Sequence, residues 1–377
     1  MTQHRADDAV AQFRGVRARG VVQCADLRAT PEVLRDGGWW AVVADFDGPA
    51  RAWRFADVEG SATDALEPPD HSGAPWSGPD PGSWRTSMDR RRYTDAVRRT
   101  REAIREGDVY QANICRVLSA PLGRADAEPD AMALAARLAV GNPAPYGGMV
   151  HVPAGSGHPP VWVVSASPEL SLAVNGGYVE SGPIKGTAPT AEELRPKDRA
   201  ENVMITDLVR NDLQRVCAPG SVEVVDLLRT EAHPGLVHLV SRVRGRLTED
   251  DPARRWAGLL AAAHPPGSVS GAPKSSALRL IAELEPVARG PYCGAVGWID
   301  ADSGQAELAV GIRTFWWEPP ADAAVPGTLR FGTGAGITWG SDPEEEWAET
   351  ELKARRLLAL ASSGSDPDAG AAPSVSA

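Results

Sequence analysis

The sequence predicts an α+β protein in which large antiparallel sheets are flanked by helices. Segments of strand-like composition arrive in runs and do not alternate strictly with helices, which is typical of the α+β class. Segments with helical spacing of apolar residues separate these runs. With 377 residues, the chain is long enough for one large core or two modest domains.

The first part, residues 1–88, is predicted to be strand-rich and to end in an exposed connection. Residues 39–44 and 50–55 have strand composition and flank the turn signal Asp47-Gly48, which predicts a β-hairpin. Residues 59–87 carry several prolines among glycines and serines, which favours an exposed connection. We expect this part to pack on the core that follows.

The second part, residues 89–361, shows regular patterns throughout. Apolar spacing predicts helices over residues 94–106, 200–215, 272–285 and 343–360. Strand-like stretches cover residues 109–118, 161–166, 170–174, 178–181, 295–299, 307–317 and 328–339. Residues 362–377 are rich in Ser, Gly, Ala, Pro and Asp, and we expect a disordered tail.

Composition excludes several classes of protein. The net charge of -11 argues against a nucleic-acid partner, because a phosphate backbone requires a basic face. No apolar run approaches the roughly 18 residues of a membrane span, and residues 1–16 lack the hydrophobic region of a signal peptide. The cysteines are far apart and form no C-x-x-C motif, which disfavours disulfides and zinc. We therefore expect a cytoplasmic protein with reduced thiols and no membrane contact.

Acidic residues on two predicted helices are candidate metal ligands. Glu346 and Glu349 are three residues apart and so share one helix face, and Glu201 stands at the start of another helix. Mg²⁺ prefers one or two carboxylates together with water and substrate oxygens. On spacing alone, a solvated acidic helix face is the commoner explanation.

Two glycine-rich segments are candidate ligand contacts. The segment 267–274 is predicted to open a helix, whose unpaired N–H groups can bind an anion; an ordinary helix start is the alternative. It lacks the spacing of a P-loop. The segment 332–336 runs into a strand, which disfavours a dinucleotide loop and favours close approach of the backbone to a ligand.

Lys185 stands in the segment Pro183-Ile184-Lys185-Gly186-Thr187, just after a predicted strand. A lysine becomes a nucleophile only when burial or a neighbouring cation lowers its pKa. A lone lysine is otherwise most often a surface residue.

A series of short segments between residues 93 and 360 occurs in the same order as in a known family. They are Gly107-Asp108-Val109-Tyr110-Gln111, Ser167-Pro168-Glu169, Pro183 to Thr187, Asp198-Arg199-Ala200-Glu201-Asn202, Asp207 to Asp212, Val237-His238-Leu239-Val240-Ser241, Gly271-Ala272-Pro273-Lys274, Ile312-Arg313-Thr314, Gly334-Ala335-Gly336 and Glu346 to Thr350. This order resembles the chorismate-utilising enzymes, specifically component I of aminodeoxychorismate synthase, a close relative of component I of anthranilate synthase. The resemblance implies an anthranilate synthase component I-like fold, with antiparallel sheets packed as a sandwich and helices outside.

The resemblance also implies a Mg²⁺ site and a chorismate site. Glu201 and Glu349 are expected to bind Mg²⁺ directly and Glu346 through water, so that the metal holds the ring carboxylate of chorismate. The substrate-binding set comprises Arg313, Tyr292, Gly334, Ala335, Gly336, Thr187, Gly271 and Lys274. Within it, Arg313, Tyr292 and the N–H groups of residues 334–336 are expected to hold the enolpyruvyl carboxylate. Lys274 is also a candidate cation beside Lys185.

The catalytic residues implied by the resemblance are Lys185, Glu169 and His238. Lys185 is expected to attack C2 of chorismate, and Glu169 to act as general acid and base at the 4-hydroxyl. His238 matches a histidine of the family's active site, with a core histidine as the alternative. Gln111 favours amination, since family members that add water tend to have lysine there.

The ammonia donor is expected to be a separate glutamine amidotransferase subunit. A glutaminase needs a nucleophilic cysteine on a tight turn, and none of the cysteines has glycine on both sides. Ala188 and residues 338–340 depart from the family pattern, and these departures affect the expected contacts at the rim of the chorismate site. Anthranilate synthase component I is the nearest alternative function, followed by isochorismate or salicylate synthesis and by a non-catalytic chorismate- or metal-binding protein.

Overall fold

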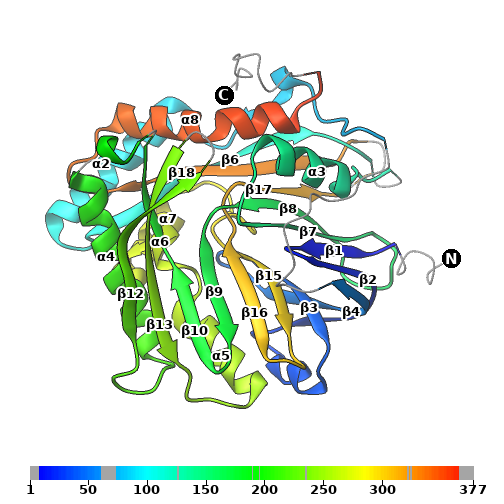
Figure 1. Cartoon of the computed structure of the whole chain (residues 1–377). Helices are drawn as coiled ribbons and strands as arrows, with labels where there is room; N and C mark the ends of the chain where they lie inside the picture. Colours follow the sequence, from blue (N-terminus) through cyan, green and yellow to red (C-terminus); the bar gives the residue numbers. More distant parts are fainter. Residues whose placement is uncertain are drawn as a thin grey trace.

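The computed structural model describes residues 8–60, 74–124, 127–188, 190–194, 196–233, 236–320, 322 and 325–364. In this part of the chain, the strands form one antiparallel sheet of 18 strands that curls on itself, with helices outside (Figure 1). The two halves of the sheet form two layers around a shared core. The α+β class and the layered antiparallel sheet predicted from the sequence are confirmed.

One half of the sheet is built from segments distant in sequence. Its strands, in the order in which they pair, are β12 (Glu223–His233), β13 (Leu236–Arg246), β10 (Tyr178–Gly182), β9 (Leu170–Asn175), β16 (Gln305–Val310), β15 (Ala295–Asp300), β3 (Trp39–Ala44) and β4 (Ala50–Gly60). The short strand β11 (Ile184–Ala188) also pairs with β13. The predicted β3–β4 hairpin is confirmed, with Ala44 opposite Ala50.

The other half continues from β4. Its strands, again in pairing order, are β2 (Val16–Asp26), β1 (Val10–Phe13), β7 (Tyr146–Val152), β8 (Val161–Ser167), β17 (Thr314–Glu318), β18 (Thr328–Ile337) and β6 (Gln111–Pro121). The short strands β5 (Arg85–Thr86) and β14 (Gly271–Ala272) also pair with β6. Strands β1 to β4 thus belong to the common sheet, and a domain boundary near residue 88 stays a prediction.

Helices cover the outer faces of both halves. Over β6, β8 and β18 lie α2 (Arg90–Glu106), α3 (Ala131–Gly141) and α8 (Pro343–Ala361). Against the other half and the β6 edge lie α4 (Pro196–Gln214), α5 (Pro252–Ala263), α6 (Gly267–Ser270) and α7 (Lys274–Leu284). Three 3₁₀ helices within the described residues are η1 (Pro31–Asp36), η2 (Pro81–Ser83) and η3 (Ala191–Glu193).

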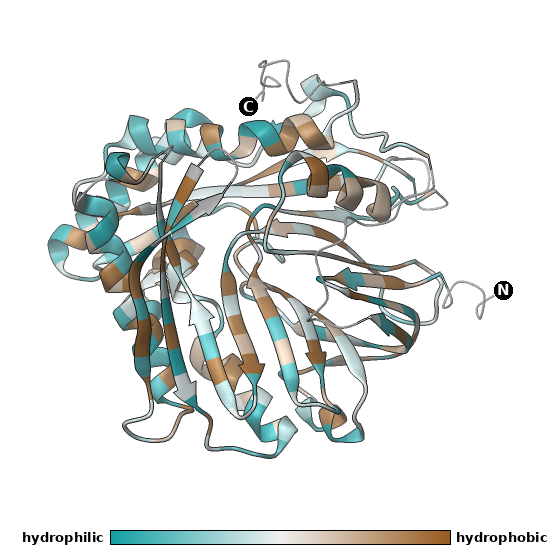
Figure 2. Ribbon diagram, in the orientation of Figure 1, coloured by the Kyte–Doolittle hydropathy of each residue, from teal (hydrophilic) through white to brown (hydrophobic). Residues whose placement is uncertain are grey.

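Burial of apolar residues accounts for this layering. Hydrophobic residues concentrate on the strands, whereas α2 and α4 are largely hydrophilic along the surface (Figure 2). The Trp39 and Trp298 rings, on the neighbouring strands β3 and β15, stack with centroids 6.4 Å apart, and both side chains are buried. The Trp39 ring also lies 6.2 Å from that of Phe13 on β1, in the other half. Two further buried clusters lie beneath α4 and α5 and beneath α3 and α8. No described helix has the length and apolar character to cross a bilayer.

The predicted strand over residues 307–317 is wrong in one respect, because the chain breaks between β16 and β17. Arg313 has φ of 52°, and the Ile312 N–H donates to Val310 O at 2.7 Å, which closes a tight turn. The continuous β-rich composition concealed this break. The break leaves Arg313 between the two strands, with its carbonyl accepting a hydrogen bond from the Ala166 N–H of β8 at 3.0 Å.

The prediction that residues 267–274 open a helix is confirmed, because α7 begins at Lys274. The segment before Lys274 is not continuous with this helix, since the short helix α6 ends at Ser270 and residues 271–272 pair with β6. Gly271 has φ of 143°, which glycine adopts readily.

Ser362, at the start of the predicted tail, is buried and accepts a hydrogen bond from Trp84 Nε1 at 3.0 Å. The tail beyond residue 364 lies outside the described residues.

Candidate active site

Lys185 lies on β11, half-buried, where its amine approaches the carboxyl end of β18. A Cβ atom added at Gly336 would lie 3.2 Å from Lys185 Nζ and 2.5 Å from Gln111 Nε2. Both side-chain nitrogens therefore lie directly over Gly336. Gln111 is buried, and its Oε1 atom has no hydrogen-bond partner in the described part of the chain. An unpaired buried carbonyl oxygen is costly, so this atom is available to a ligand.

The glycines of β18 clear one face of the strand. Side chains alternate between faces, so Gly332, Gly334 and Gly336 share a face. A Cβ atom would lie 2.0 Å from the Tyr292 ring at Gly332 and 2.5 Å from Cys115 Sγ at Gly334. The alternating glycines thus let side chains of the protein approach the backbone of β18, and the expected approach of a ligand stays a prediction.

The backbone of residues 332–337 pairs only with β6 among the described strands. Lys353 Nζ donates to Gly334 O at 3.0 Å, so the polar groups of Gly334 point away from β6. In an antiparallel ladder this orientation alternates, so Gly336 also points outward and Ala335 faces β6. The N–H groups of Gly334 and Gly336 therefore point away from β6, where a ligand could accept from them. The N–H group of Ala335 points toward β6, so the expectation that it also binds the ligand is wrong.

Glu169 is a buried carboxyl group beside Lys185. Burial raises the pKa of Glu169, while hydrogen bonds from Ser268 and from the Ile184 N–H, together with the charge of Lys185, act in the opposite direction. The net shift is upward. A carboxyl group that keeps its proton at higher pH than usual is suited to act as a general acid.

Glu201, on α4, and Glu346 and Glu349, on α8, influence one another electrostatically. Burial raises the pKa values of Glu201 and Glu346, and the charge of Glu349 raises both further. Burial acts to raise the pKa of Glu349, but its ion pair with Lys353, at 2.7 Å, together with the charges of Lys185 and Lys197, outweighs burial and lowers the pKa. The charge of Glu349 on α8 thus acts on Glu201 of α4, and the role of these carboxylates as metal ligands stays a prediction.

These carboxylates have the donor chemistry that Mg²⁺ prefers. They do not form a closed cage, since the described residues contain no group of three or more His, Cys, Asp or Glu side chains that could hold one ion. Lys353 also occupies one oxygen of Glu349. The arrangement fits an ion that keeps water and substrate oxygens in its coordination shell, as Mg²⁺ usually does.

Arg313 and Tyr292 come from two turns that contact each other. The Cys293 N–H donates to Gly311 O, and the Gly311 N–H donates to Gly294 O, both at 2.9 Å. Arg313 is half-buried, and burial lowers its pKa. Tyr292 is buried under β18, and burial raises its pKa.

His238 lies on β13, buried, in register with Thr187 of β11 and with Glu231 of β12. His238 thus lies beside the strand that carries Lys185. Its catalytic role stays a prediction.

Gly271 and Lys274 both make contacts within the protein. A Cβ atom at Gly271 would lie 2.3 Å from Gln111 O, so this glycine allows α6 and β14 to pack on β6. Lys274 Nζ lies 2.7 Å from Asp212 of α4. Because Asp212 neutralises its charge, Lys274 is poorly suited to be the cation beside Lys185.

Sequence reasoning did not single out Lys353 or Ser268. Lys353 is four residues after Glu349, a spacing that favours an ion pair on one helix face. This spacing could have indicated it. Ser268 reaches Glu169 only through the fold.

Comparison with known proteins places these features in a family. The model of the family described as chorismate binding enzyme matches residues 24–359. Anthranilate synthase component 1 of Streptomyces coelicolor is 40% identical over 287 residues, which are 73% of this chain and 52% of that protein. Aminodeoxychorismate synthase component 1 of Salmonella typhimurium is 34% identical over 288 residues, which are 73% of this chain and 59% of that protein.

Among solved structures, anthranilate synthase component I of Streptococcus pneumoniae matches with a TM-score of 0.65 and 25% identity. The match covers 92% of this chain and 81% of that one, which confirms the anthranilate synthase-like fold. The matched region spans 52% and 59% of the lengths of the two curated relatives.

Proposed function

This chain belongs to the chorismate binding enzyme family, and from that premise we propose that it is the chorismate-aminating subunit of an aminodeoxychorismate synthase. In the proposed reaction, chorismate and ammonia give 4-amino-4-deoxychorismate and water. The product would supply p-aminobenzoate and folate synthesis. The observation that carries the proposal is the position of the Lys185 amine, beside Gln111 over Gly336 and within the electrostatic influence of Glu169.

In the proposed mechanism, neutral Lys185 attacks C2 of chorismate, the two conjugated ring double bonds shift, and the 4-hydroxyl leaves as water with a proton from Glu169. Ammonia then adds at C4, the double bond shifts back, and the bond between C2 and Lys185 Nζ breaks. The new C4 ammonium returns one proton to Glu169. Holding the amine against C2 makes the first attack intramolecular, which lowers its entropic barrier.

Mg²⁺ is the proposed cofactor. Glu201 and Glu349 would hold it directly and Glu346 through water, and the ion would offset the charge of the ring carboxylate. Arg313, Tyr292 and the N–H groups of the two outward glycines of β18 would hold the enolpyruvyl carboxylate. A half-buried guanidinium forms stronger hydrogen bonds to a carboxylate than an exposed one.

A separate glutamine amidotransferase is the proposed ammonia source. Burial raises the pKa values of Cys24 and Cys217 to about 11, which disfavours the thiolate that a glutaminase needs. Cys115 and Cys293 are buried, and neither is accessible to glutamine. Both curated relatives carry the name component 1, which implies a second component in those proteins.

Anthranilate synthesis is the second candidate, because the Streptomyces coelicolor relative has that name and 40% identity. The two reactions differ in product, since anthranilate formation releases pyruvate and aminodeoxychorismate formation does not. Incubation with chorismate, Mg²⁺ and ammonium, followed by mass spectrometry, separates them. An aminated product that keeps its enolpyruvyl group supports the proposal; anthranilate with pyruvate, or a product without nitrogen, contradicts it.

A further inference from the structure

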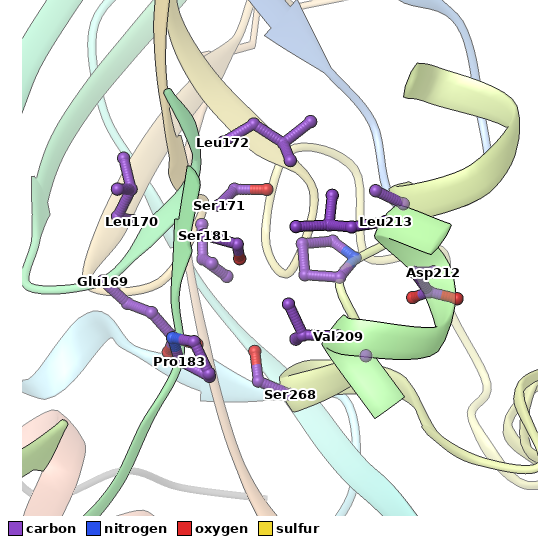
Figure 3. Close-up of a pocket in the computed structure, with 14 residues that line it drawn as sticks. Glu169, Leu170, Ser171, Leu172, Ser181, Pro183, Val209, Asp212, Leu213 and Ser268 are labelled. Atoms are coloured by element: carbon purple, nitrogen blue, oxygen red, sulfur yellow. The ribbon is translucent and has the colours of Figure 1, made fainter. Parts of the chain in front are cut away.

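A small pocket lies behind Glu169, on the side of the sheet that faces α4. Its polar lining includes Glu169 and Ser268, and Leu172, Val209 and Leu213 form much of its apolar wall (Figure 3). Its interior has room for about one water-sized molecule, which is far too little for chorismate.

Two serines of this pocket lack partners. Ser171 of β9 and Ser181 of β10 are 7% and 6% exposed, and neither hydroxyl has a hydrogen-bond partner among the described residues. Figure 3 shows both on the strands opposite Val209 and Leu213 of α4. Both residues line the pocket, so these two hydroxyls can hydrogen-bond a small polar occupant.

The lining identifies the charge that this occupant can carry. The lining residues include Glu169, and Asp212 whose carboxylate is paired with Lys274, and they include no Lys, Arg or His. Serine and carboxylate oxygens accept hydrogen bonds, so the pocket suits a molecule with several N–H or O–H donors and excludes an anion. Ammonia and ammonium have the required size and donors.

We propose that this pocket, between Glu169 and the unpartnered hydroxyls of Ser171 and Ser181, holds the ammonia that attacks chorismate. The inference rests on the proposed function, which requires ammonia beside the buried acid that serves the reacting carbon. Because Ser268 hydrogen-bonds Glu169 and lines the same pocket, the acid lies beside the position proposed for the nucleophile.

Filling the pocket tests this assignment. Ala263→Val places two extra methyl groups in the pocket, and Ala262→Val makes the same change at the neighbouring buried position of α5, which does not line it. We expect Ala263→Val to raise the KM for ammonium about tenfold and to leave the KM for chorismate and the binding of Mg²⁺ unchanged. Ala262→Val should keep the native KM for ammonium.

Val209→Ala widens the pocket and provides a second readout. We expect it to admit methylamine, so that an N-methylated product forms at a higher ratio to the ammonia product than in the native enzyme. Two results together would overturn this inference and leave the proposed function standing. They are a native KM for ammonium in Ala263→Val and, in Val209→Ala, a native ratio of the N-methylated product to the ammonia product. Absence of any aminated product from the native chain would overturn the proposed function as well, so the two failures are distinguishable.

Discussion

Lys353 Nζ lies 2.7 Å from Glu349 Oε1 and 3.0 Å from Gly334 O. One ammonium group therefore connects a proposed Mg²⁺ ligand on α8 with the glycine strand that lies under Lys185. Because Lys353 is about half exposed, its ion pair contributes only modestly to the affinity of the site.

Lys353→Met should strengthen Mg²⁺ binding in the absence of chorismate by about two- to fivefold, because it removes a cation that competes for Glu349. Isothermal titration with Mg²⁺ at pH 7 measures this change. Lys274→Met is a matched control, since that lysine pairs with Asp212, and it should leave Mg²⁺ affinity unchanged. Unchanged or weaker binding in Lys353→Met would show that Glu349 does not hold the ion.

Glu201→Gln and Glu349→Gln should each weaken Mg²⁺ binding and reduce kcat/KM by at least about 100-fold. The two side chains come from different helices, so both variants should keep the native thermal transition. Glu344→Gln, on the exposed first turn of α8, is the control and should behave as the native enzyme. Native activity of Glu349→Gln at low Mg²⁺ would refute the ligand assignment.

Gly336→Ala should reduce kcat by about 100-fold, because a methyl group there displaces Gln111 and crowds Lys185. The displaced atoms are the ends of flexible side chains, so the fold should persist. Gly340→Ala has open space around its Cβ position and should keep native activity. Equal activity of the two variants in a steady-state assay would contradict the close approach of the Gln111 and Lys185 side chains to β18.

The pH dependence of turnover should report Glu169. Its pKa is raised by burial, and the acid is active while protonated, so the rate should fall as pH rises through that pKa. The hydrogen bond from Ser268 favours the charged form and lowers the pKa. Ser268→Ala should therefore move the alkaline limb of the profile to higher pH.

Ser270→Ala, in the same short helix, removes a hydroxyl that donates to Pro266 O at 2.9 Å and should not move the limb. A shift to lower pH in Ser268→Ala would mean that the acid is another group.

Much of this site could be predicted from local sequence. The three-residue spacing of Glu346 and Glu349 indicates a shared helix face, and the alternate glycines of β18 indicate a strand that another group approaches closely. The hairpin around Asp47-Gly48 follows from turn chemistry.

Other features depend on the fold and have no local signal. Helix α3, with the sequence AMALAARLAVG, is apolar on nearly every side and shows no periodicity that separates helix from strand. The turn at Arg313 is hidden in β-rich sequence. The contact of Ser268 with Glu169 joins two segments about a hundred residues apart.

The central claim is that Lys185 forms a covalent bond to C2 of chorismate. Native enzyme mixed with chorismate and Mg²⁺, without ammonium, should accumulate a chorismate-derived adduct on the peptide that contains Lys185, as measured by intact-protein and peptide mass spectrometry. Lys185→Ala should form no adduct and should lose most of its amination activity. The control Lys197→Ala, at an exposed position of α4, should keep the adduct and the amination activity. Absence of an adduct on the native enzyme, together with undiminished amination by Lys185→Ala, would contradict the account and favour direct attack of ammonia at C2.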